Sequence, residues 1–261
     1  MGATWTLTPP YFLVLGFLCG VAGFRVGWRT GSRVLLPAIQ GLVGWGVFLL
    51  SWTIVGPIWA AAAVGAWGVG TTLISVYVFL GRPAEADARV MRAEAYRAAM
   101  LSWLSSGRGP ESVPGATILQ HARELIRYLA AATLTANLVS LAMGAALLNM
   151  MNAYVATLLR AATRPAIVVL FAWNVWSVIR VAAHIALGAA AASPLLAVAG
   201  GRRDAAGVRA LAIAGAAWVA ADLVLEIALS RPCGKILARA VDLSAAAEGR
   251  SADSPLTLHL S

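Results

Sequence analysis

The chain has 261 residues, of which 60% are hydrophobic and only 12% are charged, and its formal net charge is +9. Because a soluble domain carries roughly 25% charged residues, this composition argues against a water-soluble fold. The positive charge does not indicate nucleic acid binding, since the arginines lie between apolar runs and not on one basic face. The two cysteines, Cys19 and Cys233, fit neither a disulfide framework nor a metal-ligand spacing.

Apolar runs of about 20 residues recur along the chain, and in hydrocarbon such runs must be helices because their backbone groups can only be satisfied internally. The sequence therefore predicts an all-α polytopic integral membrane protein with six transmembrane helices and an amphipathic helix between the third and the fourth. The first run is expected to remain as an anchor. The spans are expected at about residues 11–28, 34–55, 57–80, 129–151, 165–199 and 208–230, in one transmembrane domain covering 1–230.

The second and third spans are separated by Gly56 alone, followed by Pro57. One continuous helix of this length would measure nearly 70 Å, against a hydrocarbon core of about 30 Å, so a tight hairpin is expected here. Its tryptophans are expected at the membrane interface and its glycines at close helix contacts. These residues are Trp45, Trp52, Trp59 and Trp67, and Gly41, Gly44, Gly46, Gly65, Gly68 and Gly70.

Residues 81–124 form a polar connector, and 231–261 a polar C-terminal tail. In the connector, apolar residues recur at spacings of three and four from Val90 to Leu104, which predicts an amphipathic helix. Two interpretations stay open: a helix lying in the membrane surface, and a connector helix that packs on the protein's own ends. The expected membrane-surface residues are Arg89, Arg92, Arg97 and Trp103.

The distribution of arginine and lysine between the loops predicts the orientation, because short basic loops stay in the cytoplasm. The larger group of basic residues follows the first, third and fifth spans. Six spans then place both termini, and so the N-terminus, on the non-cytoplasmic side. The basic tail is an objection, and a fifth span broken into two half-helices would give seven spans.

The segment "ILQHARELIRYLAAATLTANLVSLAMGAAL", residues 118–147, resembles the core of the family described as domain of unknown function 599. The shared order is a span, an arginine-bearing polar segment, a helix with a basic start followed by small and hydroxyl residues, and two further spans. The resemblance covers about residues 71–230. It implies a similar fold and no activity, because that family has none established.

The fifth span carries Arg180 and His184, and the sixth carries Asp222 and Glu226. A spacing of four places each pair on one helix face. Ionisable groups inside a bilayer normally face the protein interior and find partners, so Arg180 is expected to pair with Asp222 or Glu226, with His184 nearby. Asn174 and Asn137 are expected to join this intramembrane polar cluster.

The cluster has two interpretations: a proton or ion relay or binding site in a small transporter or channel-like protein, and a polar clamp that fixes helix packing. The alternative function is a non-catalytic accessory or assembly subunit of a larger membrane complex. No P-loop, GxSxG or HExxH motif occurs, so a non-enzymatic role is favoured. No cofactor and no metal are expected. The expected partners are the lipid bilayer with anionic lipids, and membrane proteins or further copies of the chain, not nucleic acid.

Overall fold

The computed structural model describes residues 8–107, 114–200 and 204–248. Over these ranges the protein is helical, and its one β-type pairing is an isolated bridge between Ala162 and Val241. Six helices are long and apolar enough to cross a membrane. The predicted all-α polytopic fold is therefore confirmed.

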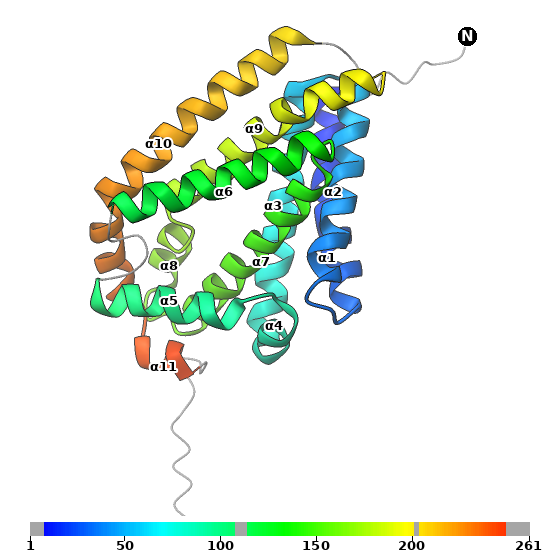
Figure 1. Cartoon of the computed structure of the whole chain (residues 1–261). Coiled ribbons are helices and arrows are strands. Elements are labelled where there is room, and N and C mark those ends of the chain that lie inside the picture. Colours follow the sequence, from blue (N-terminus) through cyan, green and yellow to red (C-terminus); the bar gives the residue numbers. More distant parts are fainter. Residues whose placement is uncertain (1–7, 108–113, 201–203, 249–261) are drawn as a thin grey trace, which may run out of the picture.

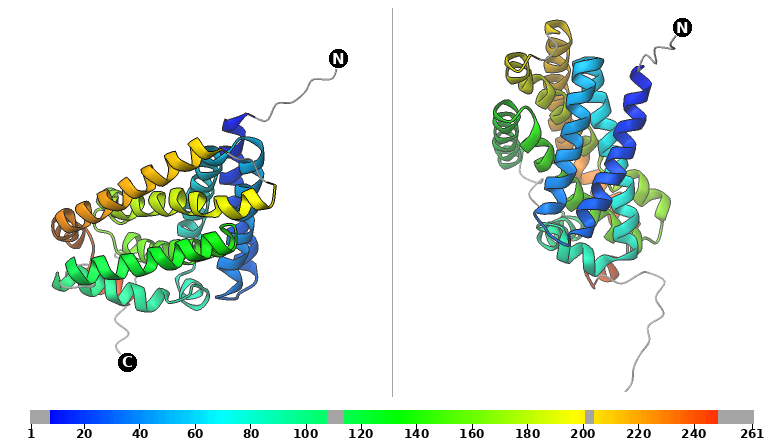
Figure 2. Two further views of the ribbon diagram at one scale, coloured as in Figure 1. Left: turned by 45° about the horizontal axis from the view of Figure 1, so that its top comes forward. Right: turned by 90° about the vertical axis from the view of Figure 1, so that its right-hand side faces the viewer.

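The first three helices stand side by side as an upright layer (Figures 1 and 2). They are α1 (Pro9–Arg29), α2 (Leu35–Ile54) and α3 (Pro57–Gly81), close to the predicted spans. Gly56 has a φ of 97°, a left-handed conformation that glycine adopts without steric cost. This residue reverses the chain, and Pro57 begins α3, so the predicted hairpin is present.

Small residues allow α1 and α3 to approach closely. A Cβ atom added to Gly70 would lie 2.2 Å from the Phe17 carbonyl oxygen, whereas one added to Gly65 would meet nothing within 4 Å. The predicted close contacts thus hold for Gly70 but not for Gly65. The interfacial prediction is wrong for Trp52 and Trp67, which are buried within the protein.

The connector forms α4 (Pro83–Arg89) and α5 (Ala93–Ser106), which break at Val90. The apolar face of α5 packs on the protein itself, because Trp103 is 3% exposed and lies in one core cluster with Leu158 and Leu237. The membrane-surface assignment is thus wrong for Trp103, and the connector interpretation describes α5.

The arginines of the connector also bind the protein. Arg89 donates to the Trp28 carbonyl oxygen at 2.9 Å and lies over that indole ring, 4.7 Å from its centroid. Arg97 pairs with Asp87 at 2.5 Å. Of the four expected membrane-surface residues, Arg92 is the one classed as exposed.

The prediction of one continuous helix over residues 129–151 is wrong, because the helix is interrupted within this range. The chain forms α6 (Pro114–Leu134), reverses, and continues as α7 (Leu138–Arg160). Asn137 has a φ of 75°, which asparagine tolerates because its side chain bonds locally. Ser140 Oγ donates to Asn137 Oδ1 at 2.5 Å, and Trp45 Nε1 donates to the Ala136 carbonyl oxygen at 2.9 Å.

This reversal is buried beside the middle of α2, since Trp45 lies at the centre of that helix. Asn137 is 1% exposed. Non-helical backbone at membrane depth is tolerated where protein surrounds it. In Figure 1, α6 crosses the side of the molecule, and α7 runs back from the reversal towards α5 and α8.

The expected span at 165–199 consists of two helices, α8 (Pro165–Phe171) and α9 (Val175–Val198). The helix is interrupted before Asn174. At this interruption Trp173 Nε1 donates to Asn152 Oδ1 at 3.1 Å. The last span, α10 (Ala205–Ala238), continues through Pro232, and α11 (Leu243–Glu248) follows. The prediction of a polar tail beginning at residue 231 is thus wrong for residues 231–248, because these residues form helices in which Leu237 and Ala246 are buried. Residues 249–261 of the expected tail lie outside the described ranges.

The helix ends define two faces of the molecule. At one, Asp242 N donates to the Ala161 carbonyl oxygen, so α10 ends beside the end of α7. At the other, a Cβ on Gly207 would lie 2.8 Å from Pro57 Cγ, so α10 begins beside the α2–α3 turn. The start of α1 lies at this second face (Figure 1). Within the described residues α1 therefore begins and α10 ends at opposite faces, because the chain makes an extra reversal at Asn137.

Close packing of α1 on α3 predicts that Gly70→Ala lowers the thermal unfolding midpoint of the detergent-purified protein, because the new methyl group meets the backbone of α1. Gly65→Ala, in the same helix, should leave it unchanged or raise it slightly, since alanine favours helix by about 1 kcal/mol over glycine. Tryptophan fluorescence during heating measures both. Equal midpoints for the two variants would contradict this packing.

Candidate functional site: a charged pocket between three helices

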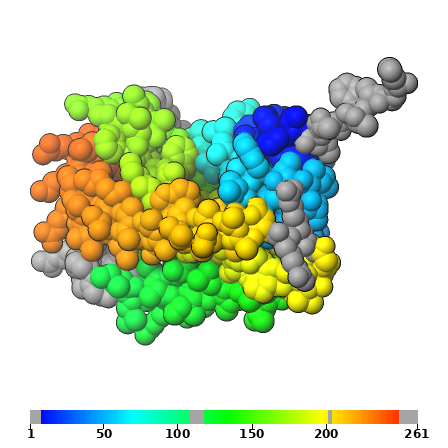
Figure 3. All heavy atoms as spheres, turned by 90° about the horizontal axis from the view of Figure 1, so that it is seen from above, coloured from blue at the N-terminus to red at the C-terminus, as the bar shows by residue number. Residues whose placement is uncertain are grey.

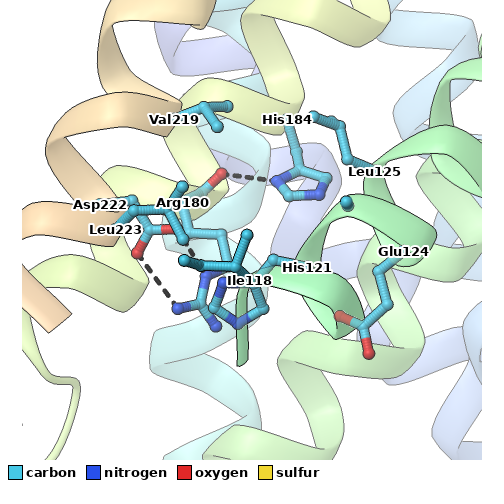
Figure 4. A pocket seen from close by; sticks show the side chains of 10 residues that line it. Ile118, His121, Glu124, Leu125, Arg180, His184, Val219, Asp222 and Leu223 are labelled. Carbon is cyan, nitrogen blue, oxygen red and sulfur yellow. Dashed lines mark hydrogen bonds and ion pairs between the residues drawn. The ribbon is translucent and has the colours of Figure 1, made fainter. Parts of the chain in front are cut away.

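A pocket of about 140 Å³ lies where α6, α9 and α10 meet. Seen from above, α10 (orange) and α6 (green) lie next to each other on the surface of the molecule (Figure 3). Side chains from all three helices line the pocket (Figure 4). Its lining residues are Ile118, His121, Ala122, Glu124 and Leu125 from α6, Arg180 and His184 from α9, and Val219, Asp222 and Leu223 from α10.

Arg180 is the centre of the polar network. Its Nε donates to Asp222 Oδ2 at 2.8 Å, and its Nη2 donates to Asp222 Oδ1 at 3.1 Å. The same Nη2 also donates to Glu226 Oε2. The predicted pairing is thus confirmed with both carboxylates at once, and the fork of the guanidinium group suits this bidentate contact.

The two antiparallel helices bring these groups to one depth. Arg180 lies 18 residues before Val198, where α9 ends, and Asp222 lies 17 residues after Ala205, where α10 begins. Asp204 supports this end of α10, since its Oδ1 accepts from the Gly207 N–H at 2.9 Å. Arg180 and Asp222 thus lie at nearly equal distances along their helices from the α9–α10 connection, which places the opposite charges side by side.

The carboxylates are deeply buried, whereas the arginine reaches the pocket. Asp222 is 3% and Glu226 1% exposed, but the Arg180 side chain is 22% exposed. Charges removed from water require partners at short range. The single positive charge of Arg180 is shared between two negative charges, and it cannot fully neutralise both.

His121 was not predicted as part of this site, because no local sequence pattern indicates that α6 folds back against α9 and α10. Its Nδ1 lies 3.6 Å from Glu226 Oε2. That nitrogen is buried and has no hydrogen-bond partner among the described residues. Burial, and then the neighbouring Arg180 charge, lower the pKa of His121 below its ordinary value of 6.5. Both effects favour the neutral form of His121.

His184 lies beside the ion pairs, as predicted. Its Nδ1 is 2.8 Å from the Arg180 carbonyl oxygen, one turn earlier in α9. If Nδ1 carries the proton and donates this bond, Nε2 is left as the acceptor. Its ring packs edge-on against Tyr128 of α6, with centroids 4.9 Å apart. His184 thus joins α9 to α6 and presents a ring to the pocket (Figure 4).

Two predicted cluster members lie elsewhere. Asn137 shapes the reversal between α6 and α7, and Asn174 lies at the start of α9. Both are buried, but neither lines the pocket. Each asparagine is the residue before a helix begins, and neither makes a side-chain hydrogen bond that caps that helix. Asparagine in an apolar run marked a break in these two places, not a site.

In comparisons with family models, curated proteins and solved structures, none matches this chain.

The shared charge predicts unequal effects of two substitutions. Arg180→Gln removes the guanidinium group that two buried carboxylates share and should destabilise the protein by about 3–5 kcal/mol, the usual result of breaking a buried ion pair. Glu226→Gln keeps an acceptor for Arg180 and leaves one balanced pair, so its cost should be much smaller. Folded yield by gel filtration and the thermal unfolding midpoint report both. Equal losses would contradict charge sharing.

Proposed function

We propose that this membrane protein is a small transporter or channel-like protein, and that it moves a cation or a proton by way of the pocket between α6, α9 and α10. The observation that carries the proposal is one guanidinium group shared by two buried carboxylates beside an open cavity. Ionisable residues within spans commonly mark ion and proton pathways.

A clamp that only fixes α9 on α10 requires one positive and one negative charge. Here a second carboxylate, Glu226, is buried at the same guanidinium, and His121 faces it. Burying an additional charge is costly in a low-dielectric interior. An arriving cation would offset that cost, and this is the role we assign to the second carboxylate.

A neighbouring pocket on α6 shares one lining residue with this pocket. A second, more polar pocket lies on that helix, lined by Leu119, Gln120, Arg123, Glu124 and Arg127. Glu124 lines both pockets, with Gln120 Nε2 donating to its Oε1 at 3.2 Å. Glu124 thus places a carboxylate where the two pockets meet, beside Arg123 and Arg127.

Flux through reconstituted vesicles tests the proposal. The purified full chain is placed in vesicles that contain either pyranine, which reports protons, or fura-2, which reports divalent cations, and an inward gradient is applied with valinomycin to compensate charge. We expect flux above that of protein-free vesicles. Asp222→Asn should reduce it at least about tenfold, because a change of 1.4 kcal/mol in binding already gives this factor.

Glu94→Gln is the matched control for this assay, since it removes one exposed carboxylate from α5, outside the pocket. It should retain the full flux. The absence of proton and divalent cation flux in the folded wild-type protein would overturn the proposal. Copurification of a stoichiometric partner by such an inactive protein would favour the accessory-subunit alternative.

We further propose that the N-terminus is non-cytoplasmic and the end of α10 cytoplasmic. Basic residues gather at the face formed by the α1–α2 turn, α4, α5 and the ends of α7 and α10, and short basic segments stay in the cytoplasm. Contacts join these parts, since Arg33 Nε donates to the Ala88 carbonyl oxygen at 2.6 Å. Arg202 and Arg203, which the sequence assigned to the cytoplasmic face, lie outside the described residues.

Cysteine labelling tests this orientation. In a Cys19→Ala, Cys233→Ala background, single Thr4→Cys and Ser251→Cys variants are treated in intact cells with a membrane-impermeant maleimide. Thr4→Cys should react at once, and Ser251→Cys only after the cells are permeabilised, because α1 begins and α10 ends at opposite faces of the protein. Reaction of both in intact cells would contradict the assignment.

A further inference from the structure

We propose that the pocket binds a divalent transition-metal ion through His121, Asp222 and Glu226, and that Arg180 occupies the ion's place when the ion is absent. This inference rests on the proposed function and names the class of cation. One ligand atom from each of the three residues lies within 4.8 Å of the others. The ligands come from α6 and α10, with Arg180 of α9 between them.

The distance between two of the ligands already suits a metal ion. His121 Nδ1 and Glu226 Oε2 are 3.6 Å apart. Ligands at about 2.0–2.1 Å from a tetrahedral ion are separated by about 3.3 Å, so a small movement of either side chain is sufficient. The buried Nδ1 of His121 points to the same place, because it faces Glu226 Oε2 and has no hydrogen-bond partner among the described residues.

The charges explain why Arg180 and the ion exclude each other. Arg180 contacts Glu226 Oε2, the oxygen that faces His121, and occupies both oxygens of Asp222. A divalent ion in that place balances the two carboxylates completely, which one guanidinium group cannot do. Arg180 is part-exposed and has the length to turn into the pocket. Ion binding and the Arg180 pairs are therefore two alternative states of one site.

The ligand set selects the class of ion. Imidazole nitrogen with carboxylate oxygens suits zinc, cobalt, manganese and iron, whereas calcium and magnesium prefer oxygen alone. The burial of both carboxylates leaves few positions for water, which magnesium retains. A borderline transition metal such as Zn²⁺ or Co²⁺ is thus the expected occupant.

Binding of Co²⁺ to the purified full chain tests this inference, because ligand exchange changes the visible absorption of that ion. We expect one Co²⁺ per chain, displaced by Zn²⁺ and not by Mg²⁺. His121→Ala should weaken binding at least about 100-fold, since loss of an outer-shell partner alone costs about 10–100-fold. His121→Ala leaves the Arg180 pairs in place, so the protein is expected to fold.

Two further variants sharpen the result. Arg180→Gln should bind Co²⁺ at least about tenfold more tightly than wild type, because it removes a competing positive charge a few ångströms away. If Arg180→Gln does not fold, His121→Ala decides the test alone. Glu94→Gln is the control and should bind as wild type.

The inference and the proposed function fail in different ways. No Co²⁺ binding, or binding that His121→Ala does not weaken, overturns the metal site, while proton flux that depends on Asp222 still supports transport. Stoichiometric Co²⁺ binding that His121→Ala abolishes, with no flux in vesicles, supports the metal site and overturns the transport proposal.

Discussion

The arrangement of α9 and α10 depends on one guanidinium group that two carboxylates share in a region nearly free of water. Each of these charges loses favourable hydration when it is buried, and the attraction between the opposite charges offsets that loss only in part. The pairs therefore hold the two helices at one relative depth, because sliding either helix by a turn would separate Arg180 from Asp222. The same contact fixes the position of Glu226, and through it the polar wall of the pocket.

The third wall of the pocket depends on a different feature, the reversal at Ala136 and Asn137. A continuous helix through these residues would carry the chain away from α10, and His121 would lie far from Glu226. The reversal instead lays α6 along α9, with Tyr128 against His184. Because α6 carries Arg123, Glu124 and Arg127, it is too polar to lie wholly in lipid, and it adds a hydrated side to an otherwise apolar group of helices.

The sequence contained enough information for the long apolar helices and for the Arg180 pairing. Hydrophobic length alone gives the bounds of α1, α2 and α3, and a spacing of four residues shows which charges share a helix face. The break at Asn137 could not be read in this way, since asparagine inside a span is equally compatible with an interhelical hydrogen bond. His121 was missed for the same reason: its place depends on a tertiary contact across more than a hundred residues, which no local pattern records. The resemblance to the family described as domain of unknown function 599 stays a prediction.

These two features together explain why the charged groups meet at the side of the helix group and not at its centre. The centre, between α2, α3 and α7, is filled mainly by apolar side chains, and the buried amides of Gln40 and Asn149 there bond each other in both directions. At the side, α6 covers the ion pairs incompletely, and the pocket remains where its polar face meets α10. A helix that cannot cross the membrane alone is thus the element that gives a buried pair of carboxylates access to ions.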